Sequence, residues 1–240
     1  MNGISDEAPS RRAFLRKTGF LLTSAAVICP AVHLAQAVEK EKEPQNEKVS
    51  PPEDLMREHG VLRRILLIYE DLQGRLTSGK EFPPDVLSRA AGIIQKFIEH
   101  YHERLEEDYV FPRFEKAEKL VDLVTILQKQ HKVGRLLTEN IRRSAVPATL
   151  KQESRRKELA DSLHLFGRMY RPHAAREDTV LFPAFRSIVS AQEFDSLGEE
   201  FEDKEEDLFG KSGFEKIVGM VAELEKSLGI YELSQFTPPK

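Results

Sequence analysis

The chain has 240 residues, of which 36 are lysine or arginine and 40 are aspartate or glutamate, so its formal net charge is −4. This mild acidity argues against nucleic acids and anionic membrane surfaces as partners, because both attract basic proteins. A single cysteine excludes an internal disulfide bond and any metal site built from several thiolates. A chain of this length can bury one substantial core.

The first segment, residues 1–37, is interpreted as an export signal and not as part of the fold. Ser-Arg-Arg-Ala-Phe-Leu-Arg-Lys at residues 10–17 precedes a weakly apolar run and a small-x-small cleavage pattern that ends at Ala37. The arginine pair and its flanking residues resemble a twin-arginine signal. This resemblance implies the twin-arginine export machinery as a partner and a periplasmic or extracellular location. An uncleaved amphipathic N-terminus is the alternative.

Helical periodicity dominates the rest of the chain. Residues 38–52 are charged and bounded by prolines, and we interpret them as a flexible linker. No alternating run of apolar and polar residues predicts a strand. Proline, glycine and capping signals delimit four long helices. They are expected at about 53–77, from 85 to the Phe111-Pro112 step or a little past it, at about 118–144, and from about 152 to 183 or beyond. Short connections between them predict an all-α fold, an antiparallel up-down four-helix bundle over residues 53–187.

A C-terminal helical extension is predicted over residues 188–240. Ser190 and Glu193 form a capping-box pattern that opens a fifth helix, and a sixth is expected over 214–228. Four apolar residues are expected to pack the extension on the bundle: Phe194, Leu197, Phe201 and Leu208. The acidic run at 199–207 is interpreted as a solvated helix face, because its spacing scatters the carboxylates around the axis. The extension could also serve a homodimer or a protein partner.

One motif occurs twice in the predicted bundle, 71 positions apart. HERLEEDYVFPRF begins at His102 and HAAREDTVLFPAF begins at His173, and both contain His-x-x-x-Glu followed by Phe-Pro. Residues i and i+4 share one face of a helix, so His102 and Glu106 point the same way, as do His173 and Glu177. Each pair lies in an otherwise apolar stripe, which predicts that it faces the core.

The other two long helices each add one histidine to the predicted core. His59 follows the apolar stripe of the first helix, and His131 follows that of the third. His100 and His164 point away from these stripes and are predicted to lie on the surface. The inward-facing residues form one candidate metal site: His59, His102, Glu106, His131, His173 and Glu177.

Two glutamates in an apolar core are the reason to expect a metal. An unpaired buried carboxylate is costly, and no lysine or arginine lies squarely on either stripe to neutralise it. Imidazole and carboxylate donors suit first-row transition metals. We interpret the chain as two helical hairpins related by a pseudo-twofold axis, with both glutamates bridging two metals. For a single copy, a metal-free hydrogen-bonded His–Glu pair is the alternative, and the repetition favours the metal.

The segments REHGVL around His59, HERLEEDYVFP, KQHKVG around His131 and HAAREDTVLFP resemble the hemerythrin-like (HHE cation-binding) family. The resemblance covers residues 53–187 and implies a non-haem di-iron centre, two Fe ions with an oxo or hydroxo bridge, held by the six residues above. Oxygen-carrying members have a further histidine one turn after the third-helix ligand, where this chain has Arg135. Six protein ligands are therefore expected, and Tyr170 or solvent would complete the metal shell.

Three functions follow from the resemblance. The preferred one is an exported di-iron protein that binds or senses O2, peroxide or nitric oxide, because the missing histidine weakens the case for reversible O2 storage. The second is a di-iron oxidoreductase that consumes peroxide or nitric oxide on the same scaffold. The third is a metal-poor or zinc-binding helical interaction module. No residue is assigned a catalytic role.

Overall fold

The computed structural model describes residues 49–238, and every regular element in that range is a helix. The expectation of an all-α fold is confirmed for this part of the chain. The export signal and almost all of the linker lie outside the described residues. No helix within residues 49–238 is long and apolar enough to cross a membrane.

Three of the long helices follow the predicted ranges closely. They are α2 (Pro51–Ser78), α6 (Val121–Ser144) and α8 (Glu153–Arg176), with the short α7 (Pro147–Leu150) between the last two. Prolines occupy the first turn of α2, where a missing backbone N–H costs no hydrogen bond. Gly79 ends α2 in the left-handed conformation, with φ of 72°, and its N–H bonds to the carbonyl of Arg75.

The second long helix contains π-helical turns and runs past its Phe-Pro step. Its successive parts are α3 (Asp85–Ile93), η1 (Ile94–His102), α4 (Glu103–Leu105), η2 (Glu106–Val110) and α5 (Phe111–Lys116). Likewise, α8 continues through η3 (Glu177–Leu181) into α9 (Phe182–Phe185). Pro112 and Pro183 lie in the first turn of α5 and α9, so they permit the helix to continue. Single π turns are frequent at functional sites, and here they lie next to the candidate ligands.

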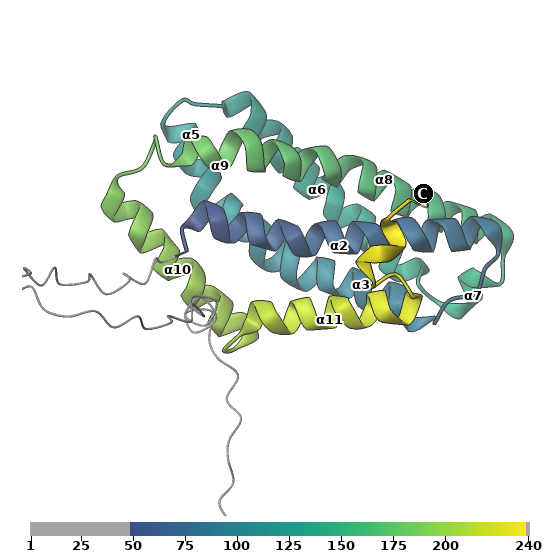
Figure 1. Ribbon diagram of the computed structural model, residues 1–240. Helices are drawn as coiled ribbons and strands as arrows, with labels where there is room; N and C mark the ends of the chain where they lie inside the picture. The colour runs from purple at the N-terminus through teal and green to yellow at the C-terminus, as the bar shows by residue number, and fades with distance from the viewer. Residues whose placement is uncertain (1–48, 239–240) are drawn as a thin grey trace, which may run out of the picture. The chain divides into compact units, whose positions relative to one another are not determined.

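Aromatic side chains supply much of the core between these helices. α2 packs along α8, and α6 packs against α8 and α3, as Figure 1 shows. Among the largest fully buried side chains are Tyr69, Phe97, Phe111, Phe166, Tyr170 and Phe182. Burying a large apolar side chain contributes about 1.5–3 kcal/mol, so this packing holds the helices in one register.

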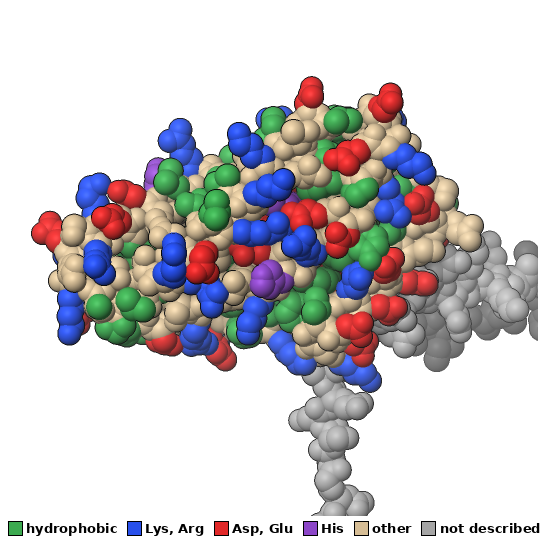
Figure 2. Space-filling model, turned by 180° about the vertical axis from the view of Figure 1, so that it is seen from behind, with side chains coloured by type: hydrophobic (Ala, Val, Ile, Leu, Met, Phe, Trp, Pro, Cys, Tyr) green, Lys and Arg blue, Asp and Glu red, His purple; other side chains and the backbone are tan. Residues whose placement is uncertain are grey.

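The face in Figure 2 carries interspersed basic and acidic side chains, with apolar groups between them.

The C-terminal extension consists of α10 (Ala191–Phe209), α11 (Gly213–Leu228) and η4 (Leu233–Phe236). Ser190 accepts a hydrogen bond from the Glu193 amide at 3.2 Å, which confirms the predicted cap. α11 runs beside α2 and α3 (Figure 1). Phe194, Leu197 and Phe201 are buried as expected.

Two expectations for the extension are wrong. Leu208 is 59% exposed, because it lies on the face of α10 that points away from the core. Glu205, expected on a solvated face, is buried and accepts a hydrogen bond from the backbone amide of Phe214 at 2.9 Å. α11 folds back against α10, so Glu205 lies at the first turn of α11, where a carboxylate satisfies an otherwise unpaired N–H.

Candidate metal centre

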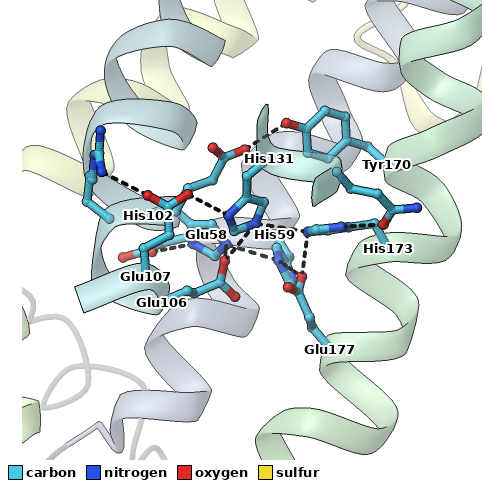
Figure 3. Close-up of polar contacts among 12 residues, drawn as sticks. Glu58, His59, His102, Glu106, Glu107, His131, Tyr170, His173 and Glu177 are labelled. Atoms are coloured by element: carbon cyan, nitrogen blue, oxygen red, sulfur yellow. Dashed lines mark hydrogen bonds and ion pairs between the residues drawn. The ribbon is translucent and has the colours of Figure 1, made fainter. Parts of the chain in front are cut away.

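All six predicted residues meet in the interior of the molecule, as Figure 3 shows. Each of the four histidines and both glutamates is buried. Within the described residues, one group of potential ligand atoms comprises Glu106, His131, His173 and Glu177, and another comprises His59, His102 and Glu106. The two groups share Glu106, so they form a single continuous site.

The histidines are arranged as two pairs. In the first pair, Nε2 of His59 lies 3.0 Å from Nε2 of His102. In the second pair, Nε2 of His131 lies 3.3 Å from Nε2 of His173. Imidazole nitrogens bind transition-metal ions at about 2.0–2.1 Å, and two that bind one ion at right angles lie about 3.0 Å apart. Each pair therefore has the spacing needed to hold one cation.

The two glutamates lie between the histidine pairs. Oε2 of Glu106 is 3.7 Å from Nε2 of His102 and 3.4 Å from Nε2 of His131. Oε2 of Glu177 is 3.3 Å from Nε2 of His59 and 3.1 Å from Nε2 of His173. Each carboxylate thus contacts one histidine of each pair, which is the arrangement expected of bridging ligands.

The surroundings of the carboxylate oxygens fit a bound cation. Both oxygens of Glu106 and both of Glu177 are buried without a regular hydrogen bond, and the groups that approach their Oε2 atoms are histidine Nε2 atoms, which are themselves potential metal ligands. Unsatisfied buried carboxylates are strongly destabilising unless a positive charge compensates them. Four imidazoles and two carboxylates form a donor set suited to iron and similar ions, so the residues present fit a two-metal centre.

A hydrogen-bond acceptor fixes the outer nitrogen of every histidine. The Nδ1–acceptor pairs are His59–Asp178 at 2.7 Å, His102–Glu58 at 2.7 Å, His131–Glu107 at 3.1 Å and His173–Gln130 at 2.9 Å. Such a bond places the proton on Nδ1 and leaves Nε2 free to bind a metal. Sequence analysis missed these four acceptor residues. Their signal was present, because each is the immediate chain neighbour of a candidate ligand and recurs in both halves of the chain.

Arg135 is a supporting residue in this structure. Its guanidinium pairs with Glu107 at 2.7 Å and with Glu103 at 2.9 Å, and so orients the carboxylate that holds His131. Arg63 occupies the equivalent place one turn after His59 and pairs with Asp178. Arg135 therefore has the same supporting role in its half of the site as Arg63 has in the other half.

Two phenylalanines of the repeated motif stack on site histidines. Phe111 stacks on His131, with ring centroids 5.5 Å apart and 30° between planes. Phe182 stacks on His59 in the same way. His100 and His164 are exposed, which confirms the prediction that they lie on the surface.

Tyr170 lies beside the site and bonds to a residue outside the predicted ligand set. Its hydroxyl donates a hydrogen bond to Oε1 of buried Glu103 at 2.7 Å, while its ring lies edge-on to His173. Gly134 makes room for it, because a Cβ there would lie 1.9 Å from the hydroxyl oxygen.

In the absence of a cation, protons supply the compensating charge. Burial and the charge of Glu177 raise the pKa of Glu106 to about 8. Burial lowers the pKa of His59, but the carboxylates of Asp178 and Glu177 outweigh it and raise that pKa to about 9. Burial and the neighbouring His59 hold the pKa of His102 well below its usual range. A cation entering the site would therefore displace protons from Glu106 and His59.

Comparison with known proteins places this geometry in a family. Residues 50–185 match the hemerythrin HHE cation-binding domain. The chain belongs to this family. The family is named for a cation-binding domain, and the clustered histidines and glutamates agree with that description.

Proteins described as uncharacterized, from Mycobacterium tuberculosis (strain H37Rv) and Mycobacterium bovis, are each 50% identical to this HHE-domain chain over 194 residues. The matched region covers 81% of this chain and 76% of each relative. No solved structure matches the chain significantly.

Proposed function

We propose that this HHE-domain protein is an exported non-haem di-iron protein that binds or senses O2 or a related small molecule, peroxide or nitric oxide. The observation that carries the proposal is the set of four buried carboxylate oxygens without hydrogen bonds, placed between two histidine pairs. Two cations would satisfy all four oxygens at once.

The proposed ligands divide evenly between two iron ions. The first pair, His59 and His102, would hold one ion, and the second pair, His131 and His173, would hold the other. Glu106 and Glu177 would be shared. Bound iron would supply reversible redox chemistry and coordination positions for a small molecule. Because the Tyr170 hydroxyl is engaged by Glu103, we propose that solvent completes the metal shell.

We further propose that the domain is an antiparallel up-down four-helix bundle. Two interhelical ion pairs support this arrangement, since Arg63 on α2 pairs with Asp178, whereas Glu70 pairs with Arg171 on α8. As the residue number rises along α2, the number of its partner falls, which is the order expected of antiparallel helices. Two contacts between α6 and α8 show the same antiparallel order, His131 with His173 and Asn140 with Ser162.

The protein's own side chains would keep the site dry and rigid. Stacked phenylalanines cover one histidine of each pair, and the acceptor residues hold each imidazole in one orientation. Rigid imidazoles lower the reorganisation needed when a metal changes oxidation state or exchanges a small ligand. This rigidity suits a site that binds a small molecule repeatedly without losing its metal.

Metal analysis combined with optical spectroscopy tests the proposal. The metal-free protein would be loaded anaerobically with Fe2+ and desalted. We expect about two irons per chain, and a new near-ultraviolet absorption band after exposure to O2, peroxide or nitric oxide. The double variant Glu106→Gln, Glu177→Gln should lose both signals, and the surface variant His100→Ala should keep them. Wild-type protein that retains no iron, or that retains only zinc, would contradict the proposal.

Export is tested separately. Wild-type protein should fractionate outside the cytoplasm, and replacement of both Arg11 and Arg12 by lysine should retain it inside. Equal distribution of the two proteins would contradict export without affecting the metal assignment.

A second candidate function is consumption of peroxide or nitric oxide. It is favoured by the six-residue donor set, which leaves more coordination positions to small molecules than a seven-residue set would. Iron-loaded wild-type protein would then remove peroxide or nitric oxide catalytically. If removal stops after about one equivalent per site, the protein is a binder or sensor.

A further inference from the structure

The two halves of the candidate centre correspond residue by residue. His59, His102 and Glu106 in the first half match His131, His173 and Glu177 in the second, at sequence offsets of 71 or 72. The stacked phenylalanines and the supporting arginines match in the same way. Because these residues match, a residue that differs between the two halves would make the two metal positions bind a cation differently.

One of the two acceptor pairs is equivalent in charge. Asp178 accepts from His59 and pairs with Arg63, and Glu107 accepts from His131 and pairs with Arg135. Both acceptors are half-buried carboxylates opposite an arginine. As direct acceptors they therefore act alike on their histidines, although Arg135 also pairs with buried Glu103 in the second half.

The other acceptor pair differs in chemical type, because one acceptor is a carboxyl group and the other is an amide. Nδ1 of His102 donates to the carboxylate of Glu58 at 2.7 Å, whereas Nδ1 of His173 donates to the amide oxygen of Gln130 at 2.9 Å. Glu58 is completely buried, and Gln130 is half-buried. A carboxylate acceptor makes its imidazole a stronger metal donor than an amide does, and burial strengthens the effect because solvent screens less.

We propose that the two metal positions are unequal, with the ion on the first pair bound first and more tightly through the Glu58–His102 hydrogen bond. The ion on the second pair, backed by Gln130, is the more readily exchanged one. This inference rests on the proposed two-metal function. Glu58 and Gln130 act through His102 and His173 and are positioning residues, not ligands.

A titration of metal-free protein with Co2+, whose visible spectrum reports the number of ligands, tests this inequality. Two nearly isosteric variants, Glu58→Gln and Gln130→Glu, each remove the asymmetry by making the two acceptors the same. We expect Glu58→Gln, which replaces the carboxyl acceptor of His102 with an amide, to weaken the first binding step about 10-fold, the lower end of the effect of changing the partner of a ligating histidine. Gln130→Glu should strengthen the second step by a similar factor. If neither step changes in either variant, the inference is wrong.

Repulsion between two cations weakens any second step, so each position must also be measured alone. The variant His131→Ala, His173→Ala leaves only the first pair, and His59→Ala, His102→Ala leaves only the second. We expect the first pair to bind a single Co2+ about 10-fold more tightly. Equal affinities, or tighter binding by the second pair, would overturn the proposal.

The possible failures are distinguishable. Circular dichroism establishes whether each variant is folded, and Gln130→Glu keeps the test decisive if Glu58→Gln does not fold, since position 130 is half-exposed. Wild-type protein that never binds a second Co2+ would defeat the two-metal function itself. If wild-type protein binds two Co2+ ions but Gln130→Glu leaves the affinity of the second step unchanged, only the proposed difference between the two metal positions is wrong.

Discussion

Phe182 stacks on His59, with ring centroids 5.6 Å apart and 24° between the ring planes. The phenylalanine belongs to the helix that carries Glu177, whereas the histidine belongs to α2. One motif therefore supplies both a carboxylate and the ring that covers a histidine of the opposite hairpin. Phe111 does the same for His131, which explains why Phe-Pro recurs after both His-x-x-x-Glu sequences.

Replacing Phe182 with leucine should loosen the site without removing a ligand. We expect the metal-free protein to lose about 1–2 kcal/mol in free energy of unfolding, from reduced packing and the lost stacking. Metal transfer to a chelator should become faster. Denaturant unfolding and chelator kinetics measure the two effects. Phe236→Leu, at a residue 53% exposed, is the control and should change neither.

Replacing Glu106 with glutamine should separate metal binding from stability. The raised pKa of about 8 means that this carboxyl is mostly protonated at pH 7 when no cation is present, so a neutral amide is a close substitute. The metal-free variant should be as stable as wild type or slightly more stable, and should retain at most about one ion per chain. Calorimetry and elemental analysis test this. Glu139→Gln, with a side chain 52% exposed, should alter neither quantity. A variant that keeps both ions would show that Glu106 is not a bridging ligand.

The metal-free protein should lose stability as the pH rises from 6 to 9. The pKa of Glu106 is raised to about 8 and that of His59 to about 9, above their ordinary values of 4.5 and 6.5. Protonation of both groups favours the folded state, and that contribution disappears as the pH rises through the two folded-state values. Two groups act in the opposite sense. Glu107 has a pKa of about 2, which confines its effect to acidic solution, and His102 has a lowered pKa, which confines its effect to pH values near and below its ordinary value of 6.5. The net loss of stability is therefore expected mainly above about pH 7.

Metal-loaded protein should behave differently over the same pH range. The cation replaces the displaced protons, so its affinity should increase up to about pH 9. Melting temperatures at pH 6, 7.5 and 9, with chelator and with Zn2+, measure both trends. A chelated sample whose melting temperature stays constant or rises would contradict the proposed proton compensation.

Tyr170→Phe should leave the metal count unchanged and reduce stability. Removing the hydroxyl deprives buried Glu103 of a hydrogen-bond donor, which should cost about 1–3 kcal/mol. Tyr231→Phe, at a residue 43% exposed, should have little effect. A fall in iron content without loss of stability would indicate that Tyr170 is itself a ligand.

Gly134→Ala should also destabilise the fold, for a steric reason. The new Cβ would lie 1.9 Å from the Tyr170 hydroxyl oxygen and 2.7 Å from the ring carbon that bears it. Overpacking of this kind costs about 1–3 kcal/mol. Gly74→Ala, where nothing lies within 4 Å of the new Cβ, should instead be neutral or stabilising because alanine favours the helix. Thermal unfolding compares the two.

Periodicity was sufficient to predict which histidines and glutamates of the candidate site face the core. The i, i+4 relation placed Glu106 beside His102 and Glu177 beside His173, and both pairs are buried together despite nearby π turns. It also placed His100 on the surface. These features depend only on the local geometry of one helix, which a short stretch of sequence determines.

Contacts between helices could not be predicted in the same way. Glu58 bonds to His102, 44 positions along the chain, and that pairing depends on the register in which two helices pack. The exposure of Leu208 and the burial of Glu205 likewise follow from how α11 folds back on α10. A carboxylate adjacent to a ligand is ambiguous in sequence, because the same residue suits a solvated face.

The residue-by-residue correspondence between the two halves of the site has a consequence for how such a centre could originate. Each hairpin supplies two histidines, one glutamate, one stacking phenylalanine and one arginine, so neither hairpin lacks a kind of residue that the other provides. Two identical copies of a single hairpin could therefore assemble the same donor set as a symmetrical dimer. Fusion of the copies into one chain would then free each half to diverge, and the glutamate and glutamine behind the histidines are what such divergence would produce.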